Sequence, residues 1–201
     1  ARHAGGVEAG VELLQRGHVV LGLDRVASEA TDIVADLCDT AAWQQALVGV
    51  GAVVHTAALH APQVGQMPDA QFQRVNVEGT RRLIDAVQRQ GVPHIVYTST
   101  TALYGASSAG VAQGQAAWLD EHSLPLPATI YHRSKLAAEQ CLKDASTQGG
   151  PALTVLRMSR CFPEPAPLMA AYRLHRGVDA RDVAAAHALA LERGPAAAAQ
   201  T

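Results

Sequence analysis

Short apolar runs alternate with segments of helical periodicity along most of the 201 residues, and this alternation constrains the fold more than any other feature of the sequence. Apolar runs bounded by polar breakers are typical of buried parallel strands. The predicted strands are 18–23, 52–56, 94–99 and 153–156. The predicted helices are 7–16, a short one within 39–47, 69–90, 130–148 and 180–193. This order predicts an α/β protein with a doubly wound, Rossmann-like parallel sheet.

The first predicted helix has one apolar face, formed by Val7, Val11 and Leu14, and Gly17 is a suitable residue to end it. Three other stretches lack a strand or helix pattern. We expect a long loop over 105–128, neither helix nor central strand over the proline-rich 163–167, and a frayed tail over 195–201.

Composition excludes several classes of protein. The formal net charge is -2, which leaves no basic excess to bind nucleic acid, and no apolar run is long enough to cross a membrane. No signal peptide is visible, and three widely spaced cysteines, Cys38, Cys141 and Cys161, predict reduced thiols that are buried or half-buried. We therefore expect a cytoplasmic protein without a metal site.

Ligands of doubly wound sheets bind beyond the carboxyl ends of the strands, so the residues after each strand are the candidate binding residues. Asp24 follows the first predicted strand and could accept the two hydroxyls of an adenosine ribose, which favours NAD; Arg25 beside it could hold a 2′-phosphate, which keeps NADP as the alternative. Asp36 and Leu37 could frame an adenine. For both aspartates the other interpretation is a solvated turn residue.

The next two strand ends carry small and hydroxylated residues. Ala57 and Ala58 would let the main chain approach a cofactor closely. His55, just before them, is better explained as a hydrogen-bonded histidine near the core. The hydroxyls of 99–101 could bond a carbonyl or alkoxide, or could be ordinary strand residues.

Tyr131 and Lys135 form the most specific pair, because a spacing of four places both on one face of a helix. A tyrosine with a pKa near 10 is a poor acid or base at neutral pH, and a neighbouring ammonium lowers that pKa by stabilising the phenolate. Lys135 is one of only two lysines in the chain. The pair predicts a tyrosine acid/base whose pKa is lowered by the lysine.

Taken together, these motifs resemble the NAD-dependent epimerase/dehydratase branch of the extended short-chain dehydrogenase/reductase family. They occur in the family's order and cover about residues 5–190. The matching segments are Arg16–Val20 with Asp24, Ala35–Leu37, Val53–Ala58, Asn76–Thr80, Tyr97–Thr100 with Tyr104–Gly105, Tyr131–Glu139 and Gly177–Ala184.

The resemblance implies a role for each matched residue. Tyr131 would exchange a proton with a substrate hydroxyl or carbonyl, Lys135 would bind the nicotinamide ribose, and Thr100 would hold the substrate oxygen. Asn76 would be a structural link in the long helix. The implied chemistry is hydride transfer between the nicotinamide and a carbon that bears oxygen.

The chain departs from the family's pattern at both ends. Gly6 matches the third glycine of the family's G-x-x-G-x-x-G loop, His3 stands where the second would be, and the opening strand is absent, which favours a sequence that begins inside the motif. Within the chain we expect residues 1–160 to be the NAD(P)-binding domain with the Tyr/Lys helix, and 161–201 to be a remnant of the family's substrate-binding part.

The sequence therefore leaves two candidate functions. The leading one is an NAD(P)-dependent oxidoreductase, epimerase or dehydratase acting on a small, sugar-like molecule such as a nucleotide sugar. The alternative, suggested by the damaged glycine loop, is a non-catalytic dinucleotide-binding or regulatory protein; a flavodoxin-like domain would leave Tyr131 and Lys135 unexplained. By analogy with the family, helices 69–90 and 130–148 predict a homodimer, without a nucleic-acid or membrane partner.

Overall fold

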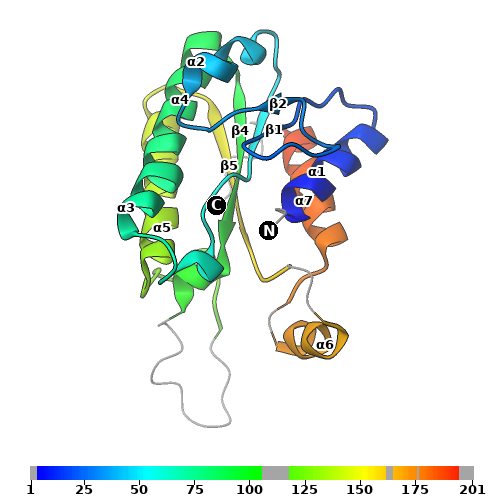
Figure 1. Ribbon diagram of the computed structural model, residues 1–201, viewed down its shortest axis with the longest axis vertical. Coiled ribbons are helices and arrows are strands. Elements are labelled where there is room, and N and C mark those ends of the chain that lie inside the picture. Colours follow the sequence, from blue (N-terminus) through cyan, green and yellow to red (C-terminus); the bar gives the residue numbers. More distant parts are fainter. Residues whose placement is uncertain (1–3, 106–117, 162–164, 176, 195–201) are drawn as a thin grey trace.

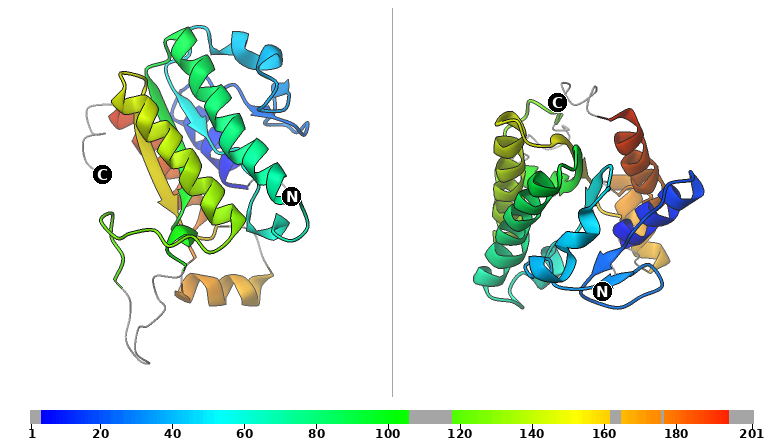
Figure 2. Two further views of the ribbon diagram at one scale, coloured as in Figure 1. Left: turned by 90° about the vertical axis from the view of Figure 1, so that its left-hand side faces the viewer. Right: turned by 90° about the horizontal axis from the view of Figure 1, so that it is seen from above.

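The computed structural model describes residues 4–105, 118–161, 165–175 and 177–194. Parallel strands form the middle layer, with helices on both faces (Figures 1 and 2). This arrangement confirms the predicted doubly wound α/β fold.

The strands form two parallel sheets. The larger has the order β3 (Val53–His55), β4 (His94–Thr100) and β5 (Ala152–Met158), and the smaller pairs β1 (Leu23–Asp24) with β2 (Ile33–Val34). Within the described ranges, β3 and β1 each pair on one side only. The strand predicted over 18–23 is therefore shortened to its last residue plus Asp24, and Val19 within it is 96% exposed.

One face of the larger sheet is covered by two long helical segments that lie side by side (Figure 2). The first is the predicted 69–90 helix, which the structure divides into three consecutive parts, and the second is α5 (Ile130–Thr147). The parts are α3 (Asp69–Phe72), the π-helical η3 (Gln73–Glu78) and α4 (Gly79–Gln90). Their apolar residues and those of the strands form the main core together with Trp43; the core includes Val87, Ile95, Tyr97, Ala138 and Leu142.

The other face is covered by α1 (Ala4–Gln15) and α7 (Ala180–Arg193), which pack against each other. The predicted helix over 7–16 is confirmed as α1, but Val7, Val11 and Leu14 on its apolar face are 38%, 45% and 57% exposed. The buried residues are Ala9 and Leu13, because α1 packs along α7 rather than lying flat on the strands.

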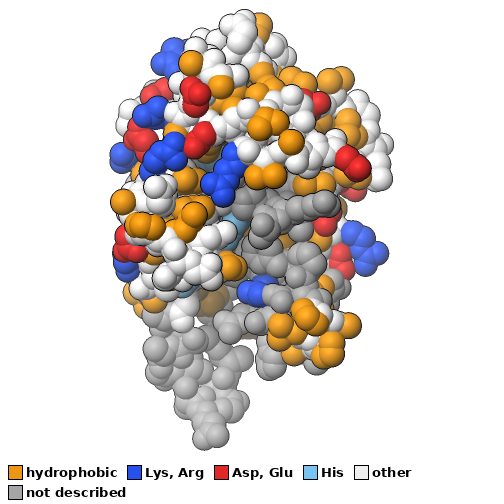
Figure 3. Space-filling view, viewed as in Figure 1, with side chains coloured by type: hydrophobic (Ala, Val, Ile, Leu, Met, Phe, Trp, Pro, Cys, Tyr) orange, Lys and Arg blue, Asp and Glu red, His pale blue; other side chains and the backbone are white. Residues whose placement is uncertain are grey.

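Short elements complete the described chain. They are α2 (Thr40–Trp43), η1 (Gln44–Leu47), η2 (Ala61–Gln63), η4 (Thr101–Tyr104) and α6 (Ala166–His175). Helix α6 overlaps the stretch 163–167, where no helix was expected. Its start at Ala166 places Pro167 in the first turn, where proline needs no amide partner. Leu168 on this helix is 42% exposed, and Figure 3 shows apolar side chains over its surface.

The cysteine prediction is confirmed, because all three thiols are free, with Cys38 and Cys161 buried and Cys141 half-buried. Across the described ranges no helix combines the length and the apolarity needed to cross a bilayer. Residues 106–117 of the expected loop and the tail 195–201 lie outside the described residues.

Candidate active site

Tyr131 lies in the first turn of α5, at the carboxyl end of β4. The helix begins here because Thr129 has an extended backbone and its Oγ1 accepts a hydrogen bond from the amide of His132, at 3.3 Å. This cap places the Tyr131 ring inward, where it is 7% exposed, and the side chain of Thr100 lies close enough to lower the pKa of its hydroxyl. The structure thus brings together Tyr131 and Thr100, two of the three candidate catalytic residues.

Lys135 follows one helical turn later on the same inward face and is 2% exposed. Its Nζ donates to the carbonyl oxygen of Thr98 at 2.7 Å and lies 4.1 Å from the centre of the Tyr97 ring. The ammonium is therefore held under the end of β4 by a backbone carbonyl and an aromatic face.

Burial dominates the protonation of both side chains. It raises the pKa of Tyr131 to about 12, against a smaller lowering by the Thr100 hydrogen bond. It lowers the pKa of Lys135 to about 7, opposed by the charge of Glu139. In the chain without NAD the expected lowering of the Tyr131 pKa is not found, because desolvation of the phenolate outweighs the effect of Thr100.

Asn76 joins three parts of the site, as the resemblance implied. Its Oδ1 accepts from the amide of Leu59 at 2.7 Å, and its Nδ2 donates to the Leu59 carbonyl at 3.0 Å and to Ser134 Oγ at 2.9 Å. Ser134 Oγ in turn donates to the backbone carbonyl of Tyr131 at 3.0 Å. The π-helical turn that holds Asn76 therefore fixes the start of α5 against the segment after β3.

His55 is a core histidine, as expected. It is buried, its Nε2 lies 2.9 Å from Thr80 Oγ1, and burial lowers its pKa to about 3. Thr80 gives its hydroxyl proton to the Asn76 carbonyl at 2.7 Å, so Nε2 of the neutral imidazole is the donor to Thr80.

The ribose candidates lie at the carboxyl end of β1. Asp24 is half-buried and its Oδ1 accepts from the amide of Val26 at 2.9 Å, whereas Arg25 is exposed. Asp24 thus stabilises the turn after β1, in agreement with its interpretation as a turn residue. Its carboxylate still lies at the carboxyl end of the strand.

The adenine candidates follow β2. Asp36 accepts from the Cys38 amide at 2.8 Å and from Arg74 Nη2 at 2.9 Å, and these two partners keep its pKa below the usual value against the effect of burial. Leu37 is packed against α4 so closely that a Cβ on Gly79 would lie 2.9 Å from Leu37 Cδ2. The pair is therefore fixed against the η3–α4 helix.

Gly6 brings α1 close to the end of β3. A Cβ at this position would lie 2.8 Å from Thr56 Oγ1, so only glycine allows this approach without a shift of the threonine. Ala57 and Ala58 follow directly, half-buried and buried. A helix amino terminus and small side chains at a strand end fit the pyrophosphate of a dinucleotide. His3 lies outside the described residues.

Two charged residues of the site were missed by the sequence reasoning. Glu139 and Arg157 form a two-point ion pair at 2.6 and 3.0 Å, and Ser99 Oγ and the Tyr104 hydroxyl bond the same pair. The available signal was the spacing of four between Lys135 and Glu139, which places the carboxylate on the buried face of α5.

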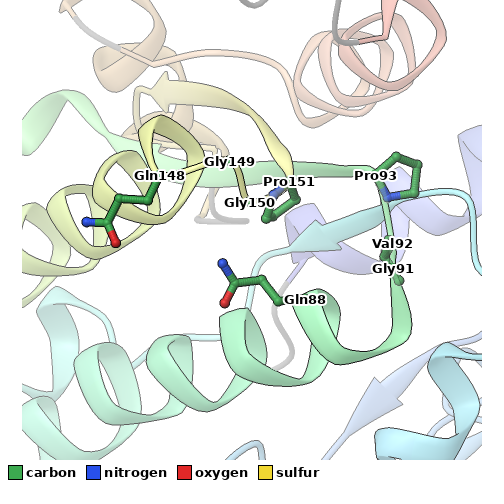
Figure 4. Close-up of a pocket in the computed structure, with 8 residues that line it drawn as sticks. All are labelled: Gln88, Gly91, Val92, Pro93, Gln148, Gly149, Gly150 and Pro151. Carbon is green, nitrogen blue, oxygen red and sulfur yellow. The ribbon is translucent and has the colours of Figure 1, made fainter.

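A pocket of about 420 Å³ lies at the opposite end of the sheet (Figure 4). Gln88 and Gly91 at the end of α4 and Gln148 and Gly149 at the end of α5 line it, beside the residues that precede β4 and β5. It is remote from Tyr131, and none of the candidate site residues lines it.

The fold is parallel α/β, Gly6 brings the start of α1 close to β3, and α5 carries the buried Tyr131 and Lys135. These features are those of a nucleotide-binding protein of the Rossmann-like class. The model of the NAD dependent epimerase/dehydratase family matches residues 9–166. The chain belongs to this family.

Individual relatives are similar over part of their length. The chain is 33% identical over 135 residues to N-acetyl-alpha-D-glucosaminyl-diphospho-ditrans,octacis-undecaprenol 4-epimerase of Escherichia coli O157:H7, matching 65% of this chain and 37% of that protein. It is 30% identical over 212 residues to a putative dihydroflavonol 4-reductase of Synechocystis sp. (strain ATCC 27184 / PCC 6803 / Kazusa), matching 92% of this chain and 59% of that protein. The chain thus spans less than two thirds of these curated relatives.

A solved structure agrees with the sequence comparison. The UDP-glucose 4-epimerase of Thermus thermophilus, in complex with NAD, superimposes with a TM-score of 0.76 at 26% identity. The match covers 93% of this chain and 71% of that one.

Proposed function

We propose that this chain carries the cofactor-binding and proton-transfer machinery of an NAD-dependent enzyme that acts on a nucleotide sugar or a similar small hydroxyl or carbonyl compound. Membership of the epimerase/dehydratase family supports the reaction class. The similarity to a UDP-glucose 4-epimerase with bound NAD supports the choice of substrate and cofactor.

The residues present fit NAD. Asp24 would bind the adenosine ribose, Asp36 and Leu37 the adenine, and the close approach at Gly6 leaves room for the pyrophosphate beside Ala57 and Ala58. Lys135 would bind the nicotinamide ribose. Bound NAD supplies the acceptor and donor of a hydride at its nicotinamide ring.

Within this site Tyr131 is the proton donor and acceptor. As a buried phenol it can give its proton to a substrate carbonyl oxygen, and the Thr100 hydroxyl bonds the same oxygen and orients it. The reverse step needs a phenolate, and the Lys135 ammonium, one helical turn later on the same buried face, would stabilise its negative charge once NAD is bound. The burial of both side chains keeps bulk water away from the Tyr131 hydroxyl and the Lys135 ammonium.

The observation that carries the proposal is the burial of Tyr131 against Thr100 at the end of β4. We expect Tyr131→Phe to lower the turnover of UDP-glucose by about 10²- to 10⁴-fold, because it removes the exchangeable proton and little volume. Product formation measures turnover, and calorimetric titration with NAD measures cofactor binding, which the substitution leaves unchanged.

Unchanged turnover in Tyr131→Phe would rule out the assigned role. A non-catalytic dinucleotide-binding protein is the second candidate, favoured by the raised pKa of Tyr131 and by the Lys135 ammonium that bonds a backbone carbonyl. It would bind NAD in the same titration and convert none of the nucleotide sugars tested. Arg25 makes NADP the competing cofactor, so the titration is repeated with NADP.

The division of the chain belongs to the same proposal. Residues 1–160 would form the cofactor-binding unit, and residues 161–201 would belong to the substrate-binding part. Helix α7 of the second segment packs on α1 and on β4 and β5, so it also supports the sheet.

A further inference from the structure

Glu139 is a buried carboxylate that the proposed proton transfer does not use. It lies on the inward face of α5 and is 1% exposed. Its Oε1 accepts from Ser99 Oγ and from Arg157 Nε at 3.0 Å, and its Oε2 accepts from Arg157 Nη2 at 2.6 Å. Both oxygens are therefore engaged by β4 and β5 rather than by α5 itself.

Lys135 is the second cation within reach of this carboxylate. Residues four apart on a helix have their Cβ atoms about 5–6 Å apart, and both of these side chains are buried on the same face. Nevertheless the Lys135 ammonium bonds the Thr98 carbonyl, one residue before the serine that bonds Glu139. Two cations thus stand beside one carboxylate, and the arginine holds it.

We propose that Arg157 is a positioning residue for Lys135: by holding Glu139 in a two-point ion pair, it keeps the carboxylate from capturing the lysine ammonium, which stays at the end of β4 beside the site. This inference deepens the proposed function, on which its value for Tyr131 rests. Without Arg157, Glu139 would be a buried, unpaired anion, and Lys135 is the cation that could neutralise it.

The other titratable groups around Lys135 do not take this role. His55 from β3 is neutral because burial lowers its pKa to about 3, and burial keeps the pKa of Tyr97 from β4 well above its usual value. Tyr131 on α5 is likewise a neutral phenol. His187 from α7 lies 2.6 Å from Thr98 Oγ1, and burial lowers its pKa also. Glu139 is thus the charge that acts on Lys135, and it raises the pKa of the lysine.

The two lysines of the chain, Lys135 and Lys143, make the test direct. We label the lysines with ¹³C at Cε and follow both signals by NMR against pH in the whole chain, without NAD or substrate; Lys143→Arg assigns them. In Arg157→Met the Lys135 titration midpoint moves up by about one to three pH units, because the freed carboxylate pairs with it. In Glu139→Gln it moves down. Arg89→Met, which removes an exposed arginine from α4, leaves it in place.

Opposite shifts in the two variants support the proposal, since general loosening of the site would move both midpoints toward the value of a solvated lysine. Equal Lys135 midpoints in the wild-type chain and in folded Arg157→Met overturn the proposal. Arg157 would then only link β5 to Tyr104 through its hydrogen bond. If Arg157→Met does not fold, Arg157→Lys is measured instead. It keeps one contact to Glu139, so we expect a smaller upward shift of the Lys135 midpoint. An unchanged midpoint in Arg157→Lys overturns the proposal. Since no turnover is measured, failure here is distinguishable from failure of the proposed function.

Discussion

At the scale of single residues, the site depends on how burial and charge act on one phenol. Burial alone would keep Tyr131 protonated, and the hydroxyl of Thr100 offsets only part of that effect. The phenol is thus protonated at neutral pH, but its raised pKa makes it a weaker proton donor, and the phenolate left after donation requires positive charge close by. The stability of the Tyr131 phenolate therefore depends on where the Lys135 ammonium lies.

Buried neutral histidines give the protein a pH-dependent stability. The pKa of His55 is about 3 in the folded chain, below the usual value of 6.5, so between these values the unfolded chain binds more protons. The free energy of unfolding therefore falls as the pH falls through this window. We expect His55→Gln, which can still bond Thr80, to lessen the loss between pH 7 and pH 4 by about 3 kcal/mol.

Urea unfolding at several pH values measures this difference. His122→Gln, at an exposed position, is the matched control and keeps the wild-type slope. An acid loss in His55→Gln as large as in the wild type would contradict the assignment of a neutral, buried imidazole.

The sequence predicted the residues whose roles depend on chain order and missed those whose roles depend on contacts across strands. Tyr131 and Lys135 share a helical face because of their spacing alone, and Asn76 was recognised from its motif. The pairing of Glu139 with Arg157 joins α5 to β5, and no local pattern shows which buried carboxylate meets which guanidinium. The raised pKa of Tyr131 was missed for the same reason, because burial is a property of the assembled site.

At the scale of elements, predictions were reliable where both faces of an element are covered. Strand β4 and helix α5 have the expected bounds to within a residue, because β4 lies between two strands and α5 packs on the sheet. Residues 18–22 have strand-like composition but no strand partner among the described residues, so they stay irregular. The apolar positions of α1 predicted the helix, but an apolar stripe does not say which neighbour will cover it, and this one is left exposed.

The approach of α4 to Leu37 gives a test of the adenine site. A Cβ on Gly79 would lie 2.9 and 3.3 Å from two carbons of Leu37, so Gly79→Ala forces this side chain to move. Alanine otherwise favours a helix over glycine by about 1 kcal/mol, which offsets part of the cost in stability. We therefore expect a several-fold weaker affinity for NAD with little change in melting temperature.

Calorimetric titration and thermal unfolding measure the two quantities. Gly51→Ala is the matched control, because a Cβ there would have nothing within 4 Å. Equal NAD affinity in both variants would mean that Leu37 does not line the cofactor site.

At the scale of the whole molecule, the outer surface of α4 and α5 is the expected contact between two copies of the chain. The two helices lie side by side on one face of the sheet (Figure 2), and two such pairs would form a four-helix bundle. We expect a mass twice the 21.0 kDa of one chain by light scattering coupled to size exclusion. A mass of 21.0 kDa at every concentration would refute the dimer.

The one-sided pairing of β1 and β3 within the described ranges has a practical consequence for anyone who handles this protein. Among the described residues each of these strands has a hydrogen-bonded neighbour on one edge only, and Val19 and Leu21 beside β1 are exposed by 96% and 57%. An unpaired strand edge can pair with another extended chain. We therefore expect light scattering to rise with time in concentrated stocks of this chain and to stay constant in dilute ones. Dilute storage, or a peptide ligand of strand-forming sequence, would preserve the sample.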